Sequence, residues 1–181
     1  MNPLSYFLYR LEKKSILNLL SRRTIIQKSG KALDLGTGRG WSLKLIPTEF
    51  SSIYAVDQSI KMTQLVKQKY PTVDVTCCNA LNTPYSSETI DLIMCVGLSE
   101  YIIDIHHLVA EISRLLTKGG FAIITSSPAN IFNQMRKLLG HKIYFRSVST
   151  MHEIFKSYEI NIIKTNHSPI QDQFLIFKSN V

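Results

Sequence analysis

Short apolar segments alternate with helix-like segments along the chain, and this alternation limits the fold more than any other feature. Seven apolar segments can be identified, at 31–35, 52–57, 73–77, 90–96, 121–125, 160–165 and 173–178. Several are apolar without regular alternation, which is typical of strands buried on both faces of a parallel sheet. The last two lie close enough in the chain to pair as an antiparallel hairpin. The pattern predicts an α/β fold with a doubly wound, mostly parallel seven-stranded sheet and a C-terminal antiparallel hairpin.

Helix-like segments occupy the spaces between the predicted strands. Apolar residues recur at helical spacing, which predicts helices over about residues 3–28, 41–46, 60–70, 105–116, 129–139 and 149–156. The segment Lys118-Gly119-Gly120 is expected to end the fourth of these. Because we find no repeat, linker or low-complexity segment, we predict one domain over residues 1–181. Within it, residues 1–30 would form an N-terminal helical cap and residues 31–181 the core.

The composition is that of a globular protein, with 45% apolar and 19% charged residues. No run of about 18 apolar residues is present, and charges interrupt the N-terminal segment, so we expect neither a membrane-spanning helix nor a signal peptide. The three cysteines, Cys77, Cys78 and Cys95, match neither a disulfide framework nor a zinc site. We therefore expect a cytoplasmic protein with reduced thiols and no bound metal.

The formal net charge of +8 favours contact with anions, which include nucleic acids, anionic lipids and acidic metabolites. The basic residues are nevertheless spread thinly and form no long block. One of the loose groups contains Arg136, Lys137, Lys142 and Arg146. We interpret these groups as a solvated basic face, with a functional patch as the alternative.

A glycine-rich turn, Gly36-Thr37-Gly38-Arg39-Gly40, follows the first predicted strand. Ligands of open α/β sheets bind outside the carboxyl ends of the strands, and glycines there allow a ligand to approach the backbone closely. A dinucleotide-binding turn would have its last glycine at position 41, where this chain has Trp41. The turn therefore favours a different ligand, and a plain tight turn is the alternative.

Asp57 ends the second predicted strand. A carboxylate at this position can accept hydrogen bonds from both hydroxyls of a ribose, as in nucleotide-binding α/β folds. Alternatively, Asp57 could cap the next helix. The preceding glycine turn favours the ligand interpretation.

Taken together, these motifs resemble those of class I S-adenosylmethionine-dependent methyltransferases, over about residues 31–178. The family's first motif is matched by Asp34, Gly36, Gly38 and Gly40, and its ribose-binding acid by Asp57. The stretch from Asn79 to Tyr85 resembles the corresponding segment of the branch that includes quinone-biosynthesis methyltransferases. Here Asn79 replaces the usual Asp, Thr83 the usual Leu, and Lys118 stands where proline is common in a later turn.

The resemblance implies a Rossmann-like fold and S-adenosylmethionine as the cofactor. It also implies a set of cofactor-binding residues: Asp34, Gly36, Thr37, Gly38, Gly40, Asp57, Gln58, Asn79, Ala80, Val96 and Gly97. An Asn at position 79 can still accept a hydrogen bond from the adenine amino group.

Glu100 and Tyr101 follow the fourth predicted strand, at the edge where cofactor and acceptor would meet. They are the candidate catalytic residues, as a general base or as orienting groups. Capping of the following helix is the alternative. The predicted reaction is methyl transfer by in-line displacement, in which the positioning of the reactants provides most of the catalysis.

A small-molecule, lipid or peptide acceptor is favoured by the short region between residues 126 and 149. It would form a partly open cap with a basic, apolar-lined mouth, which is also compatible with peripheral membrane contact. Nucleic acid is disfavoured, since the Asn/Asp-Pro-Pro-Tyr motif and an RNA-binding domain are absent from the sequence. The alternatives are an RNA or protein methyltransferase that docks through the basic face, or a non-catalytic interaction module that binds the cofactor. The acceptor, the methylated atom and the oligomeric state are not indicated by the sequence.

Overall fold

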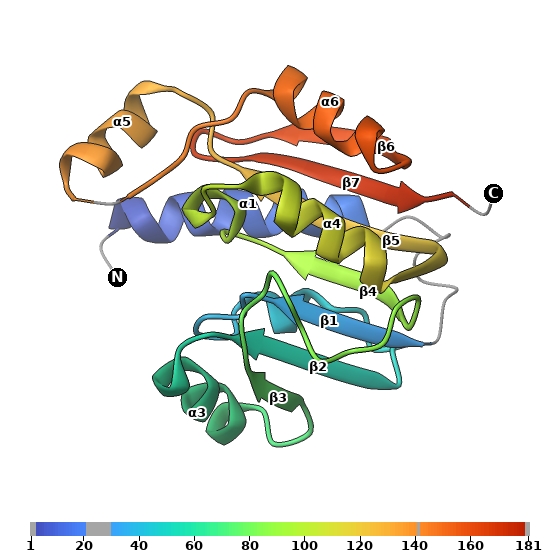
Figure 1. The fold of residues 1–181 in the computed structure, drawn as a ribbon. Coiled ribbons are helices and arrows are strands. Elements are labelled where there is room, and N and C mark those ends of the chain that lie inside the picture. The colour runs from blue at the N-terminus through green and yellow to red at the C-terminus, as the bar shows by residue number, and fades with distance from the viewer. Residues whose placement is uncertain (1–2, 21–29, 141, 180–181) are drawn as a thin grey trace.

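A computed structural model describes residues 3–20, 30–140 and 142–179, and its central feature is a seven-stranded sheet (Figure 1). The strands are β1 (Lys31–Leu35), β2 (Ser52–Asp57), β3 (Asp74–Cys77), β4 (Ile90–Cys95), β5 (Leu116–Ser126), β6 (Ile160–His167) and β7 (Asp172–Lys178). Their order across the sheet is β3-β2-β1-β4-β5-β7-β6. The first five are parallel, whereas β7 is antiparallel to both β5 and β6. The predicted doubly wound sheet with a C-terminal antiparallel hairpin is therefore confirmed.

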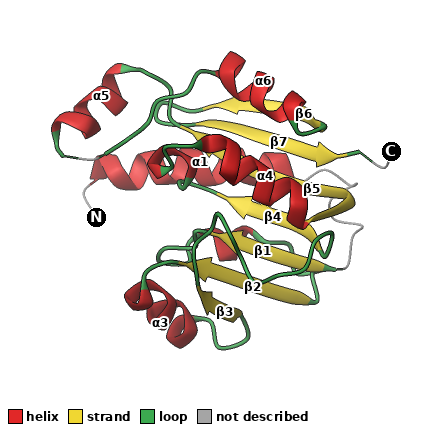
Figure 2. Ribbon diagram, in the orientation of Figure 1, coloured by secondary structure: helices red, strands yellow, loops and turns green. Residues whose placement is uncertain are grey.

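Helices cover both faces of the sheet (Figure 2). They are α1 (Pro3–Leu20), the 3₁₀ turn η1 (Ser42–Leu45), α3 (Ile60–Lys69), the 3₁₀ turn η2 (Ser99–Tyr101), α4 (Ile105–Leu115), α5 (Ile131–Leu138) and α6 (Val148–Ser157). In Figure 1, α4 and α6 lie in front of the sheet and α1 lies behind it. α5 lies apart from the sheet, beyond the carboxyl end of β5.

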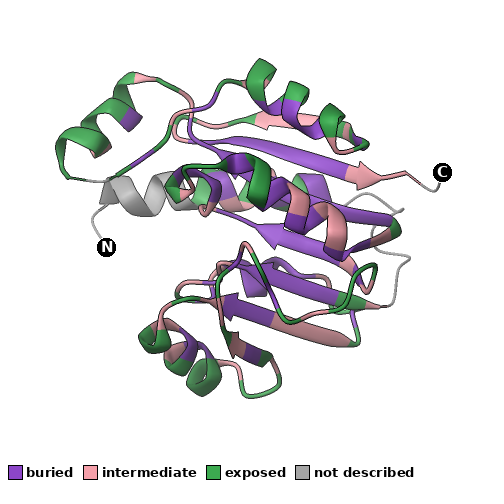
Figure 3. Cartoon of the chain, in the orientation of Figure 1, coloured by how far each residue is buried: buried purple, intermediate pink, exposed green. Residues whose placement is uncertain are grey.

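Two hydrophobic clusters, one on each face, hold these layers together. Along β4, Ile93 and Cys95 pack with residues of α4 and α6, whereas Leu92 and Met94 pack with residues of α1 and η1. Every one of these β4 side chains is fully buried, and the strands at the centre of Figure 3 are accordingly purple. This two-sided burial explains why the strand sequences are continuously apolar.

The predicted helix over residues 41–46 forms only as the single 3₁₀ turn η1, and no α-helix forms there. The segment is short and ends at Pro47, which cannot continue a helix. In addition, the Ser42 hydroxyl donates to the Asp34 carboxylate beneath the turn instead of capping a helix. The glycine turn therefore does not lead into the N-terminus of an α-helix.

The predicted break at Lys118-Gly119-Gly120 is also wrong, because these residues belong to β5. Helix α4 ends at Leu115, and β5 begins at Leu116, which pairs with Ile90. The register shifts between Ile90 and Leu92, and Gly119 takes a φ of 73° within this irregular stretch. Glycine adopts that backbone conformation without the steric penalty that a side chain would impose.

The N-terminal helix packs its C-terminal half on the sheet through Ile16, Leu19 and Leu20. The predicted continuation to residue 28 falls on residues 21–29, which lie outside the described part of the chain. The division into a cap over residues 1–30 and a core over residues 31–181 therefore stays a prediction. Of the helices that the structure describes, none combines the length and the apolar character that crossing a lipid bilayer requires.

Candidate active site

The carboxyl ends of β1, β2 and β4 meet at one edge of the sheet and bring the glycine turn, Asp57 and Gly97 to the same side. The register aligns Leu35 of β1 with Val56 of β2, so the turn and Asp57 leave the sheet at the same level. Backbone bonds then join the two strand ends, because the N–H groups of Gly36 and Thr37 both donate to the Val56 carbonyl, at 2.9 and 2.8 Å.

Two glycines of the turn are required for different reasons. Gly38 has a φ of 51°, and a Cβ added there would meet no atom of the described residues within 4 Å. Gly40 has a φ of 72°, and a Cβ there would lie 2.8 Å from a ring carbon of Tyr70. Gly40 therefore allows close packing, whereas Gly38 leaves the backbone open to a ligand.

Asp34 lies beneath the turn and is buried. Its carboxylate accepts hydrogen bonds from the hydroxyls of Thr37, at 2.6 Å, and Ser42, at 2.8 Å to both oxygens. Burial raises the pKa of Asp34 to about 6, although these hydrogen bonds lower it. Both carboxylate oxygens are directed at the turn, so the geometry suits a residue that shapes the turn from below.

Asp57 links the glycine turn to the start of α3. Its carboxylate accepts hydrogen bonds from the N–H groups of Gly38, at 2.8 Å, and Ser59, at 2.9 Å. The N-cap of α3 is Ser59, whose side chain accepts from the Met62 N–H. A carboxylate has about four acceptor positions, so Asp57 keeps two for other donors such as ribose hydroxyls. The neighbouring predicted residue, Gln58, is exposed at the same edge.

The segment after β3 carries Asn79 and Ala80, which were predicted to face an adenine. The Asn79 side-chain oxygen accepts from the Leu81 N–H at 3.0 Å, and Ala80 is buried. Thr83 donates to Glu111 of α4 through its N–H, at 2.8 Å, and its hydroxyl, at 2.7 Å. Thr83 stands where the family usually has Leu, and its hydroxyl connects this segment to α4 by a hydrogen bond.

Val96 and Gly97 follow β4, and Val96 is buried. Gly97 has a φ of 73°, and its N–H donates to the Thr125 hydroxyl at 2.8 Å. Among the described residues, a Cβ added at Gly97 would contact only the side-chain nitrogen of Gln171, at 3.7 Å. This strand end therefore also leaves room beside its backbone.

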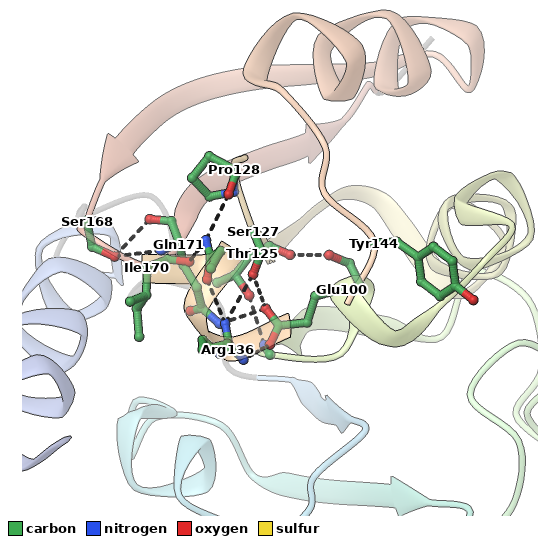
Figure 4. Close-up of polar contacts among 12 residues, drawn as sticks. Glu100, Thr125, Ser127, Pro128, Arg136, Tyr144, Ser168, Ile170 and Gln171 are labelled. Atoms are coloured by element: carbon green, nitrogen blue, oxygen red, sulfur yellow. Dashed lines mark hydrogen bonds and ion pairs between the residues drawn. The ribbon is translucent and has the colours of Figure 1, made fainter. Parts of the chain in front are cut away.

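Glu100 is buried and belongs to an ion pair that the sequence did not indicate. Its carboxylate accepts from Arg136 of α5 at 2.6 Å and from the Ser127 hydroxyl at 2.5 Å (Figure 4). Glu100 is therefore held by two groups that lie 27 and 36 residues later in the chain. Its neighbour Tyr101 is 46% exposed. Partial burial of the side chain and the negative charge of Glu100 raise the pKa of the Tyr101 phenol.

Glu12 and Gln171, two further residues beside this ion pair, were missed by the sequence analysis. Glu12 of α1 is 8% exposed, and Gln171 in the loop before β7 is 6% exposed. The side-chain nitrogen of Gln171 donates to Glu100 at 3.4 Å. The one available signal was that Glu12 precedes the buried Ile16 by one helical turn, on the face that packs inward. We call Glu12, Glu100, Ser127, Arg136 and Gln171 the inner polar cluster.

Burial and the charge of Glu100 raise the pKa of Glu12 to about 7, against the opposing effect of Arg136. Among the described residues, neither Glu12 Oε1 nor Gln171 Oε1 has a hydrogen-bond partner. The inner polar cluster thus contains two buried acceptor atoms that no side chain or backbone group of the described residues satisfies.

The interpretation of Arg136 and Arg146 as part of a solvated basic face is wrong. Arg136 pairs with Glu100, and Arg146 is buried and donates to the backbone carbonyls of Ser99 and Ile102. The Ser99 carbonyl lies in η2 and also accepts from the Ile102 N–H, whereas the Ile102 carbonyl follows the end of η2. Lys137, by contrast, is exposed, as expected of a basic face.

The residues that the structure describes contain no group of three or more His, Cys, Asp or Glu side chains that could hold a metal ion.

Comparison with known proteins places this geometry in a family. Residues 33–124, just over half of the chain, match the family described as "Methyltransferase domain". The ubiquinone/menaquinone biosynthesis C-methyltransferase of Campylobacter jejuni is 24% identical over 106 residues, which is 55% of this chain and 45% of that enzyme. A biotin biosynthesis bifunctional protein of Cellvibrio japonicus is 27% identical over 97 residues, 53% of this chain and 19% of that protein. The matched stretch thus spans less than half the length of either relative.

Solved structures share the fold. The magnesium protoporphyrin IX methyltransferase of Synechocystis, solved with bound SAH, superposes with a TM-score of 0.80 at 13% identity, over 99% of this chain and 89% of that chain.

Proposed function

The chain belongs to the methyltransferase domain family, and from this premise we propose that it transfers a methyl group to a small-molecule, lipid or peptide acceptor by in-line displacement. Its fold is the Rossmann-like fold of class I methyltransferases, and its cofactor is S-adenosylmethionine. When bound, the cofactor supplies an electrophilic sulfonium methyl group. The observation that carries the proposal is the 2.8 Å bond from the Gly38 N–H to the Asp57 carboxylate, beside the open space at Gly38.

The proposed cofactor site has three parts. Asp57 would accept the ribose hydroxyls through its remaining acceptor positions, with Gln58 beside it. Asn79 and Ala80 would border the adenine. Val96 and Gly97 would lie along the methionine end, together with the turn residues Gly36, Thr37, Gly38 and Gly40. Asp34 would act through the turn, because Thr37 and Ser42 already occupy its carboxylate.

Catalysis in this proposal is mainly positioning, which can lower a barrier by roughly 7–11 kcal/mol. Glu100 would orient the acceptor-binding side chains, since Arg136 and Ser127 hold its carboxylate. Tyr101 is 46% exposed at the same edge and would contact the acceptor directly.

The cap helix α5 supports an acceptor with an apolar part. Five of its residues or immediate neighbours are exposed apolar side chains, with exposed fractions from 45% to 86%: Ile131, Phe132, Met135, Leu138 and Leu139. Figure 3 shows this helix as mostly exposed. Lys137 and Lys142 add exposed positive charge, so an amphipathic acceptor at an anionic lipid surface suits this helix.

Isothermal titration calorimetry with S-adenosylmethionine and S-adenosylhomocysteine tests the proposal. We expect both to bind, and we expect Asp57→Ala to weaken binding by about tenfold or more, because hydrogen bonds to a charged group are lost. Asp74→Ala is the matched control, since this exposed residue begins β3 at the opposite edge of the sheet and should bind like the wild type. Failure of both compounds to bind, or equal weakening by the two variants, would overturn the proposal.

A further inference from the structure

The inner polar cluster joins side chains from five separate parts of the chain, with Ser127 in the segment between β5 and α5. Glu12 comes from α1, Glu100 from η2, Arg136 from α5, and Gln171 from the loop before β7. Figure 4 shows the Glu100 carboxylate joined by dashed lines to Arg136 and Ser127, and Gln171 lies near them. Both cap helices thus contribute a charged side chain to the interior beneath them.

Two members of the cluster, Glu12 and Gln171, each have a side-chain oxygen that no described residue satisfies. Glu100 accepts three hydrogen bonds, from Ser127, Arg136 and Gln171. Glu12 Oε1 and Gln171 Oε1 accept none from the described residues, although both side chains are more than nine-tenths buried. Folded proteins rarely leave buried acceptors without donors, because the lost hydration is not replaced.

The Gln171 side chain adjoins the proposed methyl-donor site. The side-chain nitrogen of Gln171 lies 3.7 Å from where a Cβ of Gly97 would be. The same nitrogen is 3.4 Å from the Glu100 carboxylate, and Glu12 interacts electrostatically with Glu100 and Arg136. The cluster therefore borders the end of β4, where the reacting groups would meet.

We propose that Glu12 Oε1 and Gln171 Oε1 bind the acceptor through an O–H or N–H group, and that Glu12 takes up the proton released on methylation. This inference rests on the proposed function. The acceptor oxygen or nitrogen forms a bond to the methyl carbon, and the carbon–sulfur bond breaks with its electron pair remaining on sulfur. The proton leaves the acceptor for the Glu12 carboxylate and passes from there to solvent.

The chemistry of the two atoms decides the acceptor class. Both are acceptors, so they require a donor, which hydroxyl and amino groups supply and an aprotic carbon centre does not. Glu12 also has a pKa of about 7, which suits a general base near neutral pH. The charged groups acting on Glu12 are Glu100 and Arg136, which pair with each other and leave its carboxyl to bind the acceptor.

Carbon-13 NMR of the protein labelled at the glutamate side-chain carboxyls and saturated with S-adenosylhomocysteine tests the inference. Glu12→Gln assigns the Glu12 resonance, and Glu153→Gln, which alters an exposed residue of α6, is the matched control. We expect Glu12 to titrate near pH 7. We also expect phenol and aniline to shift its resonance, and anisole and N,N-dimethylaniline, which carry no O–H or N–H group near neutral pH, to leave it unchanged.

Equal shifts by the protic and the methylated probes, no shift by either protic probe, or titration of Glu12 at the ordinary pKa would overturn the inference. Calorimetry with S-adenosylhomocysteine separates this failure from failure of the proposed function. Wild type and Glu12→Gln should bind it alike if only the acceptor inference is wrong. Neither should bind it if the proposed function is wrong.

Discussion

Glu12 has a carboxyl group that the folded state prefers to keep protonated. Its pKa rises from 4.5 to about 7 on burial. The native state then binds more protons than the unfolded state between these values, so stability falls as the pH rises through that window. A shift of this size lowers the free energy of unfolding by up to about 3 kcal/mol above pH 7.

Glu12→Gln should therefore stabilise the protein at high pH. The amide carries no charge, so we expect a gain of about 2–3 kcal/mol at about pH 8 and almost none at about pH 4. Urea unfolding at both pH values measures the difference. A variant that is less stable than the wild type at the higher pH would show that ionised Glu12 is well solvated.

Removing a charge from the Glu100–Arg136 pair should lower stability, in contrast to the gain expected for Glu12→Gln. Their side chains are 2% and 26% exposed, so Arg136→Met would leave a buried carboxylate without its cation. We expect a loss of about 2–4 kcal/mol in the free energy of unfolding. Adding Glu100→Gln should recover part of it. Lys137→Met at the exposed neighbouring position should change stability by at most about 1 kcal/mol, and a loss equal to that of Arg136→Met would contradict the argument.

At the scale of elements, the helix α5 presents more apolar surface to solvent than its neighbours need for packing. The exposed Leu138 and Leu139, beside Lys137, predict attachment to anionic bilayers. Changing both leucines to Asp should abolish sedimentation with phosphatidylserine vesicles, because it removes apolar contacts and adds repulsion. Ile163→Asp on β6 is the control and should sediment like the wild type. Equal sedimentation with neutral vesicles would contradict a charge-assisted attachment.

Strands and helices could be predicted where the local hydropathy pattern determines them. The central strands β4 and β5 follow from apolar runs because they are buried on both faces, whereas the edge strands β3 and β6 keep exposed polar positions. The segment 41–46 was not predictable, because Ser42 bonds to Asp34 eight residues earlier, and that bond competes with helix capping. The start of β5 depended likewise on the pairing of Leu116 with Ile90 in another strand.

At the scale of the whole molecule, the predictable part of the site is the part that topology fixes. Parallel strands end at one edge, so the glycine turn, Asp57 and Gly97 could be placed together from sequence alone. The inner polar cluster could not, because Arg136 and Gln171 are 36 and 71 residues from Glu100 along the chain. Charged side chains such as Arg136 are also normally exposed, so the sequence predicts a solvent-exposed side chain at a position where the fold provides a buried ion-pair partner.

The separation between the strand-end cofactor site and the inner polar cluster predicts which variants change the stabilisation by a bound ligand. S-adenosylhomocysteine would bind across the ends of β1, β2 and β4. These ends come together only in the folded state, so the ligand should stabilise the folded state and not the unfolded one. At a concentration of about 100 times the Kd, the expected gain in the free energy of unfolding is about 2.7 kcal/mol. Thermal unfolding should show this gain in the wild type and in Glu12→Gln, because Glu12 belongs to the acceptor side. Asp57→Ala should lose most of it, and a loss in Glu12→Gln as large as that in Asp57→Ala would show that the cluster serves the cofactor.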